Sequence, residues 1–163
     1  MIKLLPLMLF IATLPALAAQ PDLLPVKQIG MELARDIATH AIEVCRKQGY
    51  NVSAVVLDRA GNMQAALRDA LATRHTLEIA ERKAGMAVMS GSDTGEFRDA
   101  RGDIRAELNH INGLIVMEGG LPIRAAGSLI GAIGVSGAPG GDKDAACAVA
   151  ALKTVEERLE FAQ

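Results

Sequence analysis

The chain has 163 residues, 50% of them hydrophobic, and its 17 basic and 19 acidic residues leave a formal net charge of -2. This length favours one domain with a hydrophobic core, and the many aliphatic residues exclude a disordered chain. A nucleic-acid partner is not expected, because there is no basic excess, and three Phe, one Tyr and no Trp offer few rings for bases to stack on.

The first residues have the layout of a secretory signal peptide. Lys3 supplies a positive charge, an apolar run follows, and residues 16–18 form a small-x-small cleavage site. We predict a signal peptide over residues 1–19, cleaved after Ala18 or Ala19. The run is shorter than the roughly 20 apolar residues of a membrane span, so no anchor is expected after cleavage. The protein is then periplasmic or secreted, and a retained N-terminal membrane helix is the alternative.

The next part of the chain predicts a helix followed by a β-hairpin. Apolar residues recur every three or four positions over residues 23–48, which is helical spacing, and a glycine follows. Residues 52–57 and 63–67 are extended runs on either side of a cluster of turn residues. That arrangement is typical of two antiparallel strands joined by a short loop.

Helical spacing returns over residues 73–89, with Thr73 as a suitable N-cap. The charged residues of this helix, Lys83 among them, are assigned to its solvent side. Residues 94–112 are polar and charged, and we interpret them as a surface connection with helical fragments that covers a site.

Three extended runs and a helix complete the predicted domain. Residues 113–117, 121–126 and 128–136 are separated by glycines, and their connectors are too short for helical crossovers, which indicates a meander. Residues 143–161 have helical spacing, with Asp142 as a suitable N-cap. The prediction is therefore an α+β domain over residues 20–163, with helices packed on a five-stranded, mainly antiparallel sheet.

Export places Cys45 and Cys147 in an oxidising compartment, where they can form a disulfide. Such a bridge closes a loop of roughly 100 residues, which corresponds to about 4 to 5 kcal/mol of loop-closure entropy. Pairing requires the two Cα atoms to approach within ~7 Å, a distance that the sequence does not give. Two small buried thiols are the alternative.

Four ordered motifs carry a family resemblance: Val55–Asn62, Ala80–Ala84, Gly119–Ile123, and Leu129–Gly137 with Asp144 beyond it. Together they resemble the GlcG/HbpS family of haem-binding proteins. This family is also called the haem-degrading domain family, and it is related to the C-terminal domain of PduO-type corrinoid adenosyltransferases. The resemblance spans essentially the whole mature chain.

The resemblance implies a profilin-like or roadblock-like domain of α/β/α layers that assembles into homo-oligomers. It also implies a haem-binding function, as a carrier, sensor or scavenger, and haem degradation only by analogy with the family name. Because a fold can hold many ligands, two alternatives stay open. One is a protein that binds or transforms a small oxygenated metabolite such as a hydroxy acid or a diol. The other is a structural subunit without a ligand.

Haem iron needs an axial donor, most often an imidazole, and the chain has three histidines. His75 opens the second predicted helix and His110 lies in the polar connection, and both are candidate iron ligands. His40 lies on the first predicted helix, where an ordinary polar surface residue is the alternative interpretation.

Further candidates follow from the other needs of haem. Its propionates pair with cations, and arginines lie close in sequence to the histidines, although surface ion pairs would use them equally well. Glycines let a backbone approach a ligand, with tight strand turns as the alternative, and a serine at the end of the last strand offers a hydroxyl. These cofactor-binding candidates are Arg74, Arg82, Arg105, Gly119, Gly120 and Ser136.

No residues are predicted to be catalytic. The segment Gly134–Gly137 is similar to the nucleophile elbow of hydrolases, but its second glycine follows Ser136 immediately, and the elbow motif requires one residue between them. The three histidines are also too far apart in sequence for a helical zinc motif.

Overall fold

The computed structural model describes residues 22–161, and the predicted signal peptide lies outside them. Four strands form one antiparallel sheet with the order β2-β1-β4-β3. The strands are β1 (Ser53–Asp58), β2 (Met63–Arg68), β3 (Gly120–Ala125) and β4 (Ser128–Ser136). The central β1–β4 pair joins the two halves of the chain, so neither half completes the sheet without the other.

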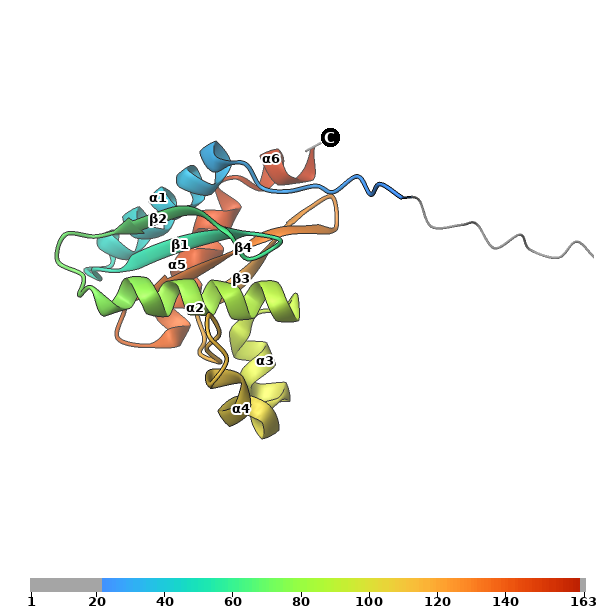
Figure 1. The fold of residues 1–163 in the computed structure, drawn as a ribbon. Helices are drawn as coiled ribbons and strands as arrows, with labels where there is room; N and C mark the ends of the chain where they lie inside the picture. The colour runs from blue at the N-terminus through green and yellow to red at the C-terminus, as the bar shows by residue number, and fades with distance from the viewer. Residues whose placement is uncertain (1–21, 162–163) are drawn as a thin grey trace, which may run out of the picture.

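Helices cover both faces of the sheet (Figure 1). α1 (Met31–Lys47) and α5 (Gly141–Lys153) pack against each other on one face, and α2 (His75–Ser90) covers the other. The remaining helical segments are α3 (Thr94–Ala100), η1 (Gly102–Ile104), α4 (Arg105–Asn109) and α6 (Glu156–Glu160). The α+β class with an antiparallel sheet is therefore confirmed. Within residues 22–161, no helix combines the length and the apolar character needed to cross a membrane.

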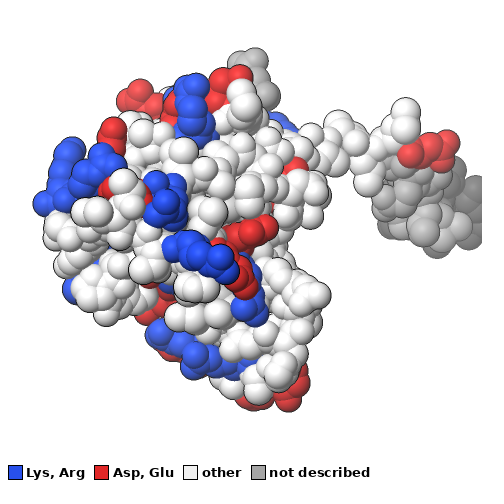
Figure 2. All heavy atoms as spheres, turned by 60° about the vertical axis from the view of Figure 1, so that its left-hand side comes forward, with Lys and Arg blue, Asp and Glu red and all other residues white. Residues whose placement is uncertain are grey.

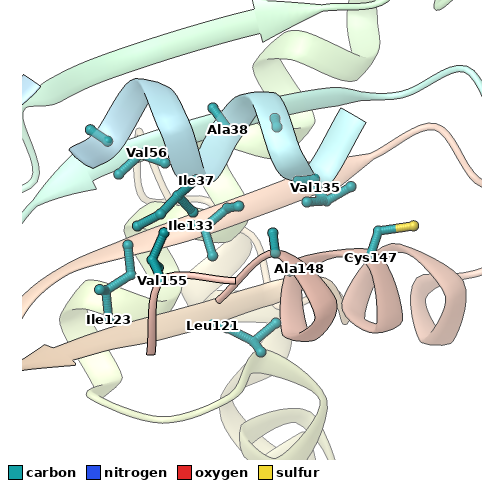
Figure 3. Close-up of a cluster of buried hydrophobic side chains, with 14 of the residues drawn as sticks. Ile37, Ala38, Val56, Leu121, Ile123, Ile133, Val135, Cys147, Ala148 and Val155 are labelled. Atoms are coloured by element: carbon teal, nitrogen blue, oxygen red, sulfur yellow. The ribbon is translucent and has the colours of Figure 1, made fainter. Parts of the chain in front are cut away.

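The larger part of the core lies between the sheet and the α1–α5 pair (Figure 3). Side chains of a strand alternate between the two faces of a sheet. Val56 accordingly packs with Ile37 of α1 and Ile133 of β4, whereas Val55 and Leu57 pack beneath α2. This two-sided burial explains why β1 has an uninterrupted apolar run rather than an alternating pattern.

The helix of the smaller core lies very close to the sheet. A Cβ atom added at Gly134 of β4 would lie 1.9 Å from the carbonyl oxygen of Ala80 in α2. Only glycine permits this approach. The residues that α2 packs against the sheet are small as well, which keeps the distance between helix and sheet short: Ala80, Ala84 and Ala87. Small residues on both surfaces therefore bring α2 within reach of the strand ends.

The predicted disulfide is confirmed. Cys45 of α1 and Cys147 of α5 are bonded, their Cα atoms lie 5.5 Å apart, and both side chains are fully buried. The bridge links the two helices that share one face of the sheet. It therefore ties together segments 102 residues apart in sequence.

The predicted number of strands is wrong, because residues 113–117 do not join the sheet. Their backbone groups have other partners: the Ile115 N–H donates to the Arg82 carbonyl (3.2 Å), and the Val116 N–H donates to the Asn109 side chain (2.8 Å). The apolar run thus packs beside α2 as an irregular segment. The sheet has four strands, not five.

The predicted first helix begins too early. α1 starts at Met31, and residues 23–30 are irregular. Pro25 does not fit a helix interior, and the Ile29 N–H donates to the Ile130 carbonyl of β4 (3.1 Å). This contact with the sheet replaces the first two turns of the predicted helix.

The predicted last helix is divided into α5 and α6. Val155 lies between them and is 2% exposed, and its non-helical backbone lets the chain bend while the side chain enters the core. The two predicted N-caps are also wrong. Arg74 and Gly140 occupy the cap positions of α2 and α5, and neither helix has a side-chain cap.

Candidate functional site

The structure separates the three histidines. His40 is partly exposed on α1, with its Nδ1 atom 3.6 Å from a carboxylate oxygen of Glu43. His75 is the exposed first residue of α2, on the opposite face of the sheet from α1. His110 is exposed immediately after α4. The three histidines therefore belong to three different elements, α1, α2 and the end of α4.

The predicted propionate partners differ in their contacts. Arg74 is exposed next to His75, and Arg105 is exposed at the start of α4. The Arg82 guanidinium is already hydrogen-bonded within the protein. It donates to the carbonyls of Leu114 (2.8 and 3.1 Å) and Asn109 (3.1 Å). Arg82 thereby fastens the segment after α4 against α2.

A polar pocket of about 430 Å³ opens at the N-terminal end of α5, and we name it the α5 pocket. Segments far apart in the sequence contribute to it: α2, α3, α4, the residues before β3, the end of β4 and the start of α5. Of the predicted residues, Arg105 and Ser136 line it, and its lining includes no histidine. The lining residues are Lys83, Arg98, Arg105, Met117, Glu118, Ser136, Gly137, Ala138, Pro139, Gly140, Gly141 and Asp144.

A buried ion pair forms the wall of the α5 pocket. Lys83 is 1% exposed, and its Nζ atom donates to Asp144 Oδ2 (2.7 Å) and to the Val135 carbonyl (2.9 Å). The other carboxylate oxygen of Asp144 accepts the Ala138 N–H (2.9 Å). Burial raises the pKa of the Asp144 carboxyl above its ordinary value, against the opposing charge of Lys83.

Lys83 was predicted on the solvent side of α2, and that prediction is wrong. Position 83 lies three residues after Ala80 and four before Ala87, on the buried stripe of the helix. Asp144 likewise lies three residues before Cys147, on the buried side of α5. The signal was therefore present in the sequence as a lysine and an aspartate at apolar positions of two helices.

The glycine pair before β3 makes room for this lysine. Gly119 has a φ of +116°, and a Cβ atom there would lie 2.8 Å from Lys83 Nζ and 2.9 Å from the Val135 carbonyl oxygen. Beside it, the Gly120 N–H donates to the Thr94 hydroxyl (2.9 Å). Lys83 and Thr94 thus fill the space next to the two glycines.

Positively and negatively charged side chains both lie at the rim of the α5 pocket. Arg98 donates to Glu118 Oε2 (3.1 Å) and to Asp99 Oδ1 (2.8 Å). The Arg105 guanidinium makes no hydrogen bond or ion pair within residues 22–161. Ser136 is 6% exposed, and its hydroxyl has no hydrogen-bonding partner in the same part of the chain. The Arg105 guanidinium and the Ser136 hydroxyl are therefore both available to hydrogen-bond a ligand in this pocket.

A second, apolar hollow of about 510 Å³ lies along the edge strand β3, and we name it the β3 groove. Side chains of β3, α5 and α6 form it, and Arg124 and Lys153 supply cations. No histidine, cysteine or methionine lines it, so it offers no common haem ligand. Its apolar lining residues include Leu121, Pro122, Ile123, Val149, Leu152 and Leu159.

The exposed charges are mixed in sign. On the face seen in Figure 2, lysines and arginines are interspersed with aspartates and glutamates. Many of them form ion pairs with a nearby side chain of opposite charge. Asp36 contacts both Arg35 and Arg158 at 2.8 Å, and Arg101 contacts Asp103 at 3.0 Å. Within residues 22–161, no three histidine, cysteine, aspartate or glutamate side chains gather as a metal site.

Comparison with known proteins gives a consistent family. The model of the haem-degrading, HbpS-like protein family matches residues 29–153. The chain is 36% identical to a protein solved as HbpS, with a TM-score of 0.76, covering 85% of this chain and 99% of that one. A double mutant of Streptomyces reticuli HbpS is 34% identical, with a TM-score of 0.76, covering 88% and 98% of the two chains.

More distant structures share the fold. The Klebsiella pneumoniae protein ORFY is 25% identical, with a TM-score of 0.78, covering 85% of this chain and 98% of that one. A PduOC–haem complex is 23% identical, with a TM-score of 0.70 and coverage of 77% and 94%, and this similarity shows the fold alone. A search of curated proteins found no match.

Proposed function

The chain belongs to the family of haem-degrading, HbpS-like proteins, and we propose that it binds haem as an exported carrier, sensor or scavenger. The observation that carries this proposal is the extent of the family match. The match runs from residue 29 to residue 153, so it includes the whole sheet and every helix from α1 to α5. The relative solved as HbpS supports it over nearly its full length.

The exposed imidazoles fit the needs of haem. Ligation requires a ring nitrogen that is not held by the protein, and no hydrogen bond or ion pair engages the imidazole of His75 or His110 in the described part of the chain. Arg74 adjoins His75, and Arg105 precedes His110 by five residues, so each imidazole has a cation nearby in sequence for a propionate. Ile111, 50% exposed, adds apolar surface beside His110. Bound haem would supply an iron centre for ligand binding or electron transfer.

Hemin titration tests this proposal. We expect a saturable shift of the Soret band in the wild-type protein. Either His75→Ala or His110→Ala should weaken binding by roughly tenfold or more, since even about 1.4 kcal/mol of lost ligation has that effect. His40→Ala is measured in parallel, and Asn112→Ala is the control, because it changes an exposed polar residue near His110.

Two outcomes would count against the proposal. If hemin produces no saturable shift in the wild-type protein, haem binding itself is refuted. If the shift persists unchanged when all three histidines are replaced together, haem binds without an axial histidine, and the assignment to His75 or His110 fails.

Export is supported by two independent features. The N-terminal residues have the pattern of a signal peptide, and the Cys45–Cys147 disulfide is a type of bond that persists in oxidising compartments. We expect protein from the periplasm or the medium to have lost residues 1–18 or 1–19, as measured by intact mass. An exported protein of full-length mass, or one confined to the cytoplasm, would refute the prediction.

Homo-oligomerisation is part of the same proposal. The β3 groove supports it, because this apolar hollow, with Val149 40% exposed, lies along an unpaired sheet edge. Light scattering of the mature protein would detect the assembly, and a mass of one chain at all concentrations would refute it.

A further inference from the structure

The α5 pocket holds a buried hydroxyl that the protein does not satisfy. Ser136 is 6% exposed, and its hydroxyl makes no hydrogen bond within residues 22–161. Every fully buried side-chain nitrogen or oxygen in that part of the chain has a partner, so this oxygen is still reachable from the pocket that Ser136 lines. Because the protein leaves this hydroxyl without a partner, it is available to water or to a ligand in the pocket.

The start of α5 adds a backbone donor to the same wall. α5 has 13 residues and begins at Gly141, and Gly140 occupies its N-cap position without a side-chain cap. The first N–H groups of a helix lack helical partners, and the helix dipole favours an anion at that end. In α5 the Lys143 N–H already donates to the Gly140 carbonyl (3.1 Å), so the donor that this end offers to a ligand is the N–H of Gly141, and Asp142 is a carboxylate in the same turn. A Cβ atom at Gly141 would lie 2.8 Å from the Cβ of Glu118, so backbone rather than side chain forms this surface. Gly140 and Gly141 both line the pocket.

The charges of the lining leave one cation unmatched. Lys83 is paired with Asp144, and Arg98 is paired with Glu118. Arg105 is the third cation of the lining, and it makes no ion pair among the described residues. Among the lining residues alone, three cations against two carboxylates leave one positive charge, which suits a ligand with one negative charge, while Asp99, the other partner of Arg98, lies outside the lining.

We propose that the α5 pocket binds a small monocarboxylate of the 2-hydroxy acid class. The carboxylate would be held by the Arg105 guanidinium, the Ser136 hydroxyl and the Gly141 N–H at the start of α5. The ligand hydroxyl would donate to Glu118, and Met117 and Pro139 would contact the carbon chain.

Size and charge restrict the occupant of the pocket further. The volume of about 430 Å³ lies within the range of small-molecule sites. A doubly charged phosphate is disfavoured, because Glu118 and Asp144 place two carboxylates in the lining. No histidine lines the pocket, but Arg105 is also the cation proposed for a haem propionate beside His110, so the two proposals share this residue.

Calorimetric titration of the haem-free mature protein tests the ligand class. Lactate is the probe, propionate lacks its hydroxyl, lactamide lacks its charge, and inorganic phosphate is a different oxyanion. We expect lactate to bind saturably, propionate about two- to tenfold more weakly, and lactamide roughly tenfold or more weakly. Absence of saturable lactate binding refutes the site, and tighter binding of phosphate refutes the monocarboxylate assignment.

Two substitutions test the residues. Arg105→Ala should weaken lactate binding by roughly tenfold or more, and Ser136→Ala by about two- to tenfold. Arg101→Ala is the matched control, because Arg101 is exposed, pairs with Asp103 and does not line the pocket. If both pocket variants bind lactate as the wild type does, the proposal is wrong. Because haem is absent from these experiments, a failed hemin titration would not change their outcome.

Discussion

Loss of the Cys45–Cys147 disulfide is expected to lower the free energy of unfolding by about 4 to 5 kcal/mol. The two cysteines are 102 residues apart in sequence, so the bond closes a loop that contains most of the domain. A loop of this length removes much of the conformational freedom of the unfolded chain. The native state gains little strain from the bond, because the Cα separation of 5.5 Å is normal for a disulfide.

Urea unfolding of the Cys45→Ala/Cys147→Ala double variant measures this effect. Wild-type protein treated with a reductant should show a similar loss, whereas the reductant should leave the double variant unchanged. The comparison separates loss of the bond from loss of two buried sulfur atoms. Equal unfolding free energies for oxidised and reduced wild-type protein would contradict the prediction.

The size of this effect links stability to the compartment. Domains of this kind are stable by about 5 to 15 kcal/mol in total, so a contribution of about 4 to 5 kcal/mol is at least about a quarter of the total. A reducing compartment would remove this contribution. The proposed export is therefore consistent with a domain that depends on an oxidised Cys45–Cys147 pair.

Local patterns in the sequence predicted most of the fold. Helical spacing identified α1, α2 and α5, and turn residues between extended runs identified both hairpins, because each of these signals lies within about 20 residues. Residues 113–117 have the same apolar character as a strand, but their backbone groups bond to Arg82 and to the Asn109 side chain instead of to a neighbouring strand. Arg82 is 32 residues away from Leu114, which it holds, and no local pattern contains that contact.

The candidate site was predicted less completely than the fold. Arg105 and Ser136 were identified singly, but their meeting in one pocket depends on how α4 and β4 are placed around α5. Lys83 and Asp144 were missed, although both interrupt apolar stripes. A charged residue on such a stripe indicates a buried partner elsewhere, and the sequence does not show which residue that partner is.

Replacing Lys83 by methionine is expected to lower the free energy of unfolding by about 3 to 5 kcal/mol. The substitution would leave the Asp144 carboxylate buried without its cation, and the Val135 carbonyl would lose its lysine donor. The Lys83→Met/Asp144→Leu double variant should recover most of this loss, since a buried pair can often be replaced by apolar residues of similar volume. Chemical unfolding of both single variants and the double variant gives the coupling energy of the pair.

The pH dependence of Lys83→Met distinguishes a lost charge partner from a packing defect. Burial already raises the pKa of the Asp144 carboxyl, and without Lys83 nothing of comparable strength opposes that effect. A group whose pKa is raised in the folded state favours folding at low pH and loses that contribution as pH rises through its folded pKa. The loss of unfolding free energy in Lys83→Met relative to the wild type should therefore be smaller at mildly acidic pH than at neutral pH.

Lys143→Met is the control. It breaks the exposed pair with Asp142 and should change the free energy of unfolding little at either pH. A deficit of Lys83→Met that does not vary with pH would indicate that Lys83 serves only to fill space between α2 and α5.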